Sequence, residues 1–85
     1  MNTEQFRTFL VAAEEGTATG AATRLGRSQS AVSRELAALE EILGVPLFRR
    51  RPRGLELTAA GRAMLSPAQD VVDAVDAMFK AVADM

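Results

Sequence analysis

The sequence predicts a mainly α-helical fold, in which three helices and a short β-hairpin precede one long helix. Apolar residues recur at helical spacing through most of the chain, and a glycine follows each of the first three helical runs. Between residues 46 and 58 two short extended segments replace the helical pattern, with Pro and Gly between them. We therefore expect a compact domain over residues 1–58 and a separate helix over residues 59–85.

The composition describes one small domain with an uneven charge. The chain has 85 residues, a net charge of −1, and neither Cys nor His, which excludes disulfides, thiol nucleophiles and the usual zinc sites. Residues 24–62 hold eight arginines against four glutamates, a net charge of +4, whereas the flanking segments are net −2 and −3. A basic centre is typical of nucleic-acid binding, although a solvated basic surface has the same pattern.

Two helices are expected in the first 25 residues. The first has Thr3 as its N-cap, Gly16 just beyond its end, and apolar residues on one face: Phe6, Phe9, Leu10 and Ala13. The second is short, ends before Gly26, and carries small residues that let a neighbouring helix approach closely. Gly20 lies inside it and is unfavourable there by about 1 kcal/mol relative to Ala.

The third helix is capped by Ser28 and stopped by Gly44 and Pro46. Its apolar stripe is Ala31, Val32, Leu36, Leu39 and Leu43. Because only a Gly-Arg-Ser joint separates it from the second helix, residues 18–37 have the layout of a helix-turn-helix, whose second helix enters the DNA major groove.

Polar side chains at the start of the third helix are the candidates for DNA recognition. Glutamine, serine and arginine can bond base edges, and the candidates of these types are Gln29, Ser30, Ser33 and Arg34. The helix N-terminus at Ser28, with Arg27 beside it, favours a phosphate. An alternative is that these are solvated polar residues opposite a core stripe.

The segment from residue 46 to 58 is predicted to be a β-hairpin wing. Pro46–Arg50 and Leu55–Thr58 are its extended parts, and the turn between them contains Pro52 and Gly54. Arg51 and Arg53 are candidates for the DNA backbone or minor groove, and Arg53 is favoured because narrow minor grooves attract Arg. Arg49–Arg51 alternate between faces, so only some of them can touch one duplex. The alternatives are an irregular loop or a basic hairpin that only aids solubility.

The last helix, with Thr58 as its N-cap, carries a heptad stripe that consists of Leu65, Ala68, Val72, Val75, Phe79 and Val82. A second row beside it repeats every seven residues: Met64, Val71, Met78 and Met85. We expect Pro67 to kink the helix near Met64. The stripe predicts pairing with a second copy of the chain; the alternative is that it folds back on its own domain.

With these features the chain resembles the N-terminal region of the LysR-type transcriptional regulators. The resemblance departs at Ser30, where that family usually has Pro, and near Ala18, where it usually has a bulky apolar residue. It covers nearly the whole chain, through Phe6, Phe9, residues 12–16 (AAEEG), Ala21, Ala22, Leu25, residues 28–34 (SQSAVSR), Leu39, Glu40, residues 43–49 (LGVPLFR), Arg53, Gly54 and residues 57–61 (LTAAG).

The resemblance implies a winged helix-turn-helix, a linker helix that forms homodimers in antiparallel orientation, and an interrupted inverted repeat of double-stranded DNA as the partner. It assigns DNA contacts to Gln29, Ser30, Ser33 and Arg34, with Arg53 on the wing. An effector-binding domain follows in that family, so we expect this chain to be the DNA-binding part of a longer bacterial regulator that works in the cytoplasm at the nucleoid. A small-molecule effector would act only through that further domain. We expect no cofactor, no metal, no membrane contact and no enzymatic activity.

Sequence-specific binding of double-stranded DNA for transcriptional control is therefore the predicted function. One alternative is a helical interaction module that dimerises through residues 59–85 and binds no DNA. Another is a winged-helix domain that reads only DNA shape or protein partners. Salt-dependent binding to a duplex would favour the first function over the interaction module.

Overall fold

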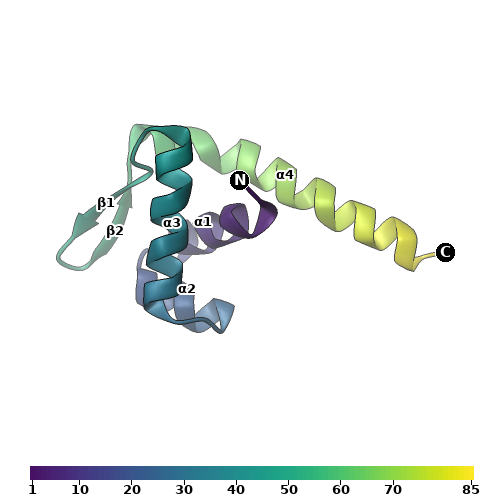
Figure 1. The fold of residues 1–85 in the computed structure, drawn as a ribbon, viewed down its shortest axis with the longest axis horizontal. Helices are drawn as coiled ribbons and strands as arrows, with labels where there is room; N and C mark the ends of the chain where they lie inside the picture. The colour runs from purple at the N-terminus through teal and green to yellow at the C-terminus, as the bar shows by residue number, and fades with distance from the viewer.

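The computed structural model describes all 85 residues (Figure 1). A three-helix body carries a two-stranded antiparallel hairpin on one side, and a long final helix projects from the other. The shape is elongated, with extents of 48 × 25 × 18 Å. This confirms the predicted fold class. The elements are α1 (Thr3–Glu15), α2 (Ala18–Leu25), α3 (Gln29–Leu43), β1 (Phe48–Arg51), β2 (Gly54–Leu57) and α4 (Ala59–Ala83).

Local side chains set the helix boundaries. Thr17, Ser28 and Thr58 each accept a hydrogen bond from a first-turn N–H, which compensates a donor that has no partner within the helix. The expected N-cap of the first helix was wrong by one residue, because Asn2 and not Thr3 caps α1. Asn2 Oδ1 accepts the Gln5 N–H at 3.1 Å, and Gln5 Oε1 accepts the Asn2 N–H at 2.9 Å, a reciprocal pair that Thr3 lacks.

The core lies between α1, α2 and α3 and extends to the base of the hairpin. Its largest fully buried side chains include Phe9, Val32, Leu39 and Leu47. The Phe9 and Phe48 rings lie 5.6 Å apart, so the first residue of β1 packs directly on α1. The hairpin is therefore anchored by the same core that orients α3.

Gly20 has a structural explanation. Its N–H donates to the Thr17 hydroxyl at 2.9 Å, and a Cβ on Gly20 would lie only 2.8 Å from that oxygen. Glu15 approaches the same position at 3.3 Å. The tight cap at the start of α2 thus favours glycine, despite the helix propensity that it loses.

The hairpin is short and is tied to the helical body. Its register pairs Phe48 with Leu57 and Arg51 with Gly54, and Pro52 and Arg53 form the turn. The Leu55 N–H donates to the Gly16 carbonyl at 2.8 Å. Gly54 has φ of 145°, and a Cβ there would lie 2.3 Å from that carbonyl oxygen. This close approach requires glycine and holds the wing against the turn between α1 and α2.

The first half of α4 packs on its own domain, which corrects the expectation of a single stripe facing a partner. Ala68 is 2% exposed and Val72 is 5% exposed, and Leu65 packs against the core cluster. An ion pair between Arg7 of α1 and Asp76 extends this contact. The fold-back alternative therefore holds for this half, because α1 offers an apolar face that α4 covers.

The second half of α4 extends beyond the body, as Figure 1 shows. Phe79 and Val82 are 74% and 72% exposed because no other part of the chain reaches them. α4 is one continuous helix through Pro67, so the expected kink near Met64 does not divide it into two helices. None of the helices has the length and apolarity that crossing a membrane requires.

Candidate DNA-binding surface

The start of α3 presents the four side chains that were predicted to read bases. Gln29, Ser30 and Arg34 are exposed and Ser33 is half-buried, while the opposite side of the helix supplies buried Val32. The Ser28 hydroxyl accepts the Ala31 N–H at 3.1 Å, which holds the helix start in a fixed geometry. The structure thus gathers the candidate side chains on the outer face of the first two turns.

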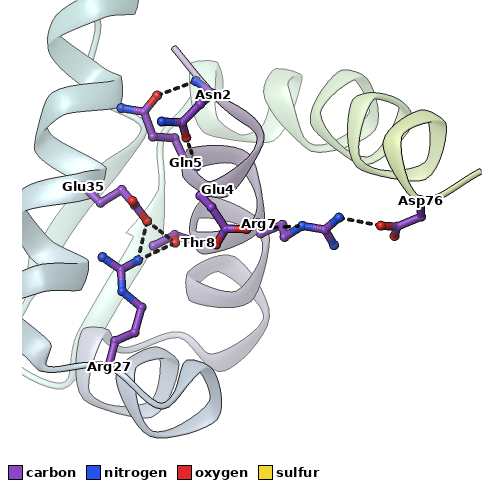
Figure 2. A network of polar contacts seen from close by, with 8 residues as sticks. All are labelled: Asn2, Glu4, Gln5, Arg7, Thr8, Arg27, Glu35 and Asp76. Atoms are coloured by element: carbon purple, nitrogen blue, oxygen red, sulfur yellow. Dashed lines mark hydrogen bonds and ion pairs between the residues drawn. The ribbon is translucent and has the colours of Figure 1, made fainter. Parts of the chain in front are cut away.

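Arg27, predicted to contact a phosphate, is directed inward instead. Its Nη1 donates to Glu35 Oε1 at 2.6 Å and lies 3.4 Å from the Thr8 hydroxyl (Figure 2). Thr8 is fully buried and donates to the same carboxylate oxygen. The group links α1, the joint before α3, and α3. The sequence did not predict this pairing, because the partners lie on other elements, where sequence spacing gives no signal. A phosphate contact of Arg27 would have to compete with the Glu35 carboxylate.

Arg51 also has an ion-pair partner within the chain. Its Nε and Nη2 donate to the two carboxylate oxygens of Glu56 at 3.1 and 3.3 Å. These hydrogen bonds lower the pKa of Glu56, with a smaller contribution from the charges of Arg51, Arg49 and Arg62. The predicted backbone contact of Arg51 would have to compete with this bidentate pair. Arg53, at the turn, is exposed and forms no ion pair.

A groove brings the recognition helix and the wing together. It runs between the start of α2, the start of α3 and the hairpin, so that Gln29 and Arg53 border one continuous surface. Its lining residues are Thr17, Ala18, Thr19, Gln29, Arg50, Arg51, Pro52, Arg53, Gly54 and Leu55. The two predicted DNA elements are therefore parts of a single face.

Glu40, on the C-terminal half of α3, fixes the base of the wing and was not among the predicted site residues. Its Oε2 accepts the N–H groups of Leu47 and Phe48 at 2.6 and 3.2 Å. On the far side of the same segment, the Thr58 hydroxyl donates to the Pro46 carbonyl at 2.7 Å. No local sequence pattern predicts this role of Glu40, since it depends on how the chain reverses after Gly44.

A three-helix body with an exposed third helix and a basic hairpin defines a winged helix-turn-helix domain of the DNA-binding class. The family described as "Bacterial regulatory helix-turn-helix protein, lysR family" matches residues 3–62. The chain belongs to this family. The family is one of transcriptional regulators, not of enzymes, which confirms the predicted class.

Similar proteins include HTH-type transcriptional regulators. The chain is 48% identical over 73 residues to TfdS of Cupriavidus pinatubonensis, an alignment that covers 86% of this chain and 25% of that protein. It is 49% identical over 69 residues to ClcR of Pseudomonas putida, covering 81% of this chain and 24% of that protein. The chain thus spans about a quarter of the length of these relatives.

Two solved structures similar to this chain are DNA complexes of isolated domains. The CbnR_DBD–DNA complex has a TM-score of 0.93 at 38% identity, covering 99% of this chain and 97% of that chain. The BenM_DBD/benA site 1 DNA complex has a TM-score of 0.90 at 31% identity, covering 99% of this chain and 98% of that chain.

Proposed function

We propose that this chain binds double-stranded DNA sequence-specifically, with α3 in the major groove and the wing at the adjacent minor groove. The observation that carries the proposal is the single face on which Gln29, at the start of α3, and Arg53, at the wing tip, border one groove. The DNA complexes of the two similar domains support it. The acidic net charge does not oppose it, because Arg50 and Arg53, which form no ion pair, line this groove, whereas Asp70, Asp73 and Asp76 lie on α4.

In this proposal the side chains divide into two groups. Gln29, Ser30, Ser33 and Arg34 read base edges, and Arg34 is free to do so because it is exposed and forms no ion pair. Ser28 and the N-terminus of α3 position a phosphate, while Arg53 enters the minor groove. Arg27 holds the helix-turn-helix together from inside through Glu35.

The proposal includes a homodimer that forms through the uncovered face of α4. This face combines Phe79 and Val82, which extend beyond the body, with the neighbouring row of Val71 and Met78. Half-buried Val75 lies at its edge, and Met85 follows just beyond the end of the helix. An apolar hollow, lined by Met1, Phe6, Leu43, Met64, Pro67, Ala68 and Val71, continues the face onto the start of α4.

An antiparallel arrangement would seat the projecting half of each α4 against the hollow of the other copy. The heptad stripe predicted six residues for the dimer interface. Of these, Val75, Phe79 and Val82 remain in this proposal, whereas Leu65, Ala68 and Val72 belong to the contact within the chain. Two copies of α3 would then face one duplex, as an interrupted inverted repeat requires.

The chain would be one part of a longer regulator. It spans about a quarter of its relatives, so the effector-binding domain, and a small molecule that acts through it, belong to the remainder of such a protein. Because the partner is bacterial DNA, we place the regulator in the cytoplasm at the nucleoid.

Fluorescence anisotropy with a labelled inverted-repeat duplex tests the function. The affinity should fall steeply with salt, because each phosphate contact releases condensed counterions. Gln29→Ala should cost about 1–3 kcal/mol on the preferred site and relax the preference at one base position. Gln69→Ala, the same change on exposed α4, is the matched control. Failure to bind duplex DNA at low salt would overturn the proposal, and equal losses for Gln29→Ala on all sequences would overturn the assignment of base reading.

A further inference from the structure

Arg50 occupies an unusual place in the wing. Directly paired residues of an antiparallel hairpin share a face, and side chains alternate along each strand. Phe48 with Leu57, and Arg50 with Leu55, therefore form one face of the wing. Phe48, Leu55 and Leu57 are partly buried against the core, which makes this the inner face, and Arg50 is its only charged residue.

The Arg50 guanidinium has no partner within the chain. Arg51, on the outer face, is paired with Glu56, but Arg50 is exposed and takes part in no ion pair or side-chain hydrogen bond. It lines the hollow between α3 and β1 together with Ser33, Leu36 and Glu40. It also lines the groove that joins Gln29 to Arg53. Arg50 therefore lies between the base-reading end of α3 and the tip of the wing.

The geometry of a DNA duplex indicates which part of the DNA lies nearest to Arg50. A sugar–phosphate strand separates each major groove from the adjacent minor groove. A domain with one element in each groove must therefore straddle that strand. In this chain the strand would cross the groove between α3 and the hairpin, where Arg50 is the free cation between the two elements.

We propose that Arg50 binds the DNA phosphodiester that passes between the recognition helix and the wing. This inference rests on the proposed function and adds a contact outside the predicted set, which named Arg51 and Arg53 on the wing. A guanidinium at this point would contact the DNA between the recognition helix and the wing, independently of the base sequence. It would fix how far the wing reaches while α3 occupies the major groove.

The alternative for Arg50 is packing alone, in which the aliphatic stem covers Leu36 and the guanidinium stays in water. Two substitutions separate the possibilities. Arg50→Met keeps most of the stem and removes the charge, whereas Arg50→Lys keeps the charge. Arg49→Met is the matched control, since it removes one wing charge from the outer face of the same strand.

The test measures the affinity of each variant for the preferred duplex and for an unrelated duplex at several salt concentrations. Arg50→Met should bind both about tenfold more weakly at low salt, with a salt slope reduced by about 1. Arg50→Lys should keep the wild-type slope, and Arg49→Met should lose much less affinity. Thermal unfolding should show that all three variants remain folded.

A set of duplexes, each with one uncharged methylphosphonate, locates the contact. In the wild type, substitution of the phosphate between the α3 and wing sites should weaken binding, and Arg50→Met should abolish that effect at this phosphate alone. A wild type that binds duplex DNA while Arg50→Met keeps its affinity and slope would overturn this inference and leave the proposed function standing. A wild type that binds no duplex at all would overturn the proposed function itself.

Discussion

Glu40 Oε2, on the recognition helix, accepts the N–H of Leu47 at 2.6 Å, where the chain enters the wing. The same oxygen accepts the next N–H, that of Phe48, at 3.2 Å. The Leu47 side chain is fully buried, so this segment is held from both its backbone and its side chain. The Glu40 carboxylate therefore ties the entry of the wing directly to α3, in addition to the hydrogen bond that joins the Leu55 N–H to the Gly16 carbonyl.

Glu40→Ala should destabilise the fold and loosen the wing. It removes the acceptor of two backbone N–H groups, and a loss of about 2–3 kcal/mol in the free energy of unfolding is expected. Glu40→Gln should lose much less, because its carbonyl oxygen can accept both bonds. Chemical denaturation measures both changes.

A double-mutant cycle tests whether Glu40 acts through the wing. If it does, the effects of Glu40→Ala and Arg53→Ala on DNA affinity should not add, since a misplaced wing has already lost the Arg53 contact. Anisotropy titrations of the two single variants and the double variant supply the cycle. Additive losses would show that the two residues act independently.

Gly61→Ala should destabilise the domain, although helix propensity alone predicts the reverse. Alanine is favoured over glycine inside a helix by about 1 kcal/mol. Here, however, a Cβ would lie 2.2 Å from the Leu47 carbonyl oxygen and 2.8 Å from Leu57 Cδ2. Because that carbonyl also accepts the Thr58 N–H at 3.0 Å, it cannot move away freely. A melting temperature equal to or above that of the wild type would contradict this prediction.

The elements of the fold could be predicted because their boundaries are encoded locally. Ser28 and Thr58 cap the helices that they precede, and Gly44 ends α3 as its position indicates. The wing followed from Pro52 and Gly54 at a turn between two extended segments. Each of these signals is read within a few residues, so it needs no knowledge of the tertiary arrangement.

The direction of side chains could not be predicted in the same way. Arg27 and Arg51 were expected to face DNA because they lie beside DNA-facing elements, but each has a carboxylate partner that only the folded chain brings near. The heptad stripe of α4 was apolar along its whole length, yet periodicity cannot tell which half meets α1. Leu65 and Phe79 occupy one row in the sequence and different environments in space.

Glu56→Gln should increase affinity for duplex DNA by releasing Arg51. The bidentate pair lowers the pKa of Glu56, so the carboxylate stays charged and the pair persists until the pH falls below the ordinary range of glutamate. Mild acidification from neutral pH should therefore leave this pair intact, whereas the substitution removes it. Anisotropy should show tighter binding and a salt slope steeper by about 1.

Glu41→Gln is the control for that experiment. It removes one negative charge from an exposed position on α3 that takes part in no ion pair, so it reports the general change in net charge. Equal gains in affinity for the two variants would mean that Arg51 does not reach the DNA even when it is free.

The uncovered face of α4 predicts which substitutions separate the two copies of a dimer. Met78 is exposed on this face, and Ala77, one residue earlier, lies about 100° round the helix on the polar side among the aspartates. Met78→Asp would bury an unpaired charge at the dimer interface, which should weaken the free energy of dimerisation by several kcal/mol per dimer. Ala77→Asp should leave the dimer intact. Analytical ultracentrifugation at micromolar concentration measures both. A wild type that sediments as a monomer, or a Met78→Asp variant that remains dimeric, would show that this face is not the dimer interface.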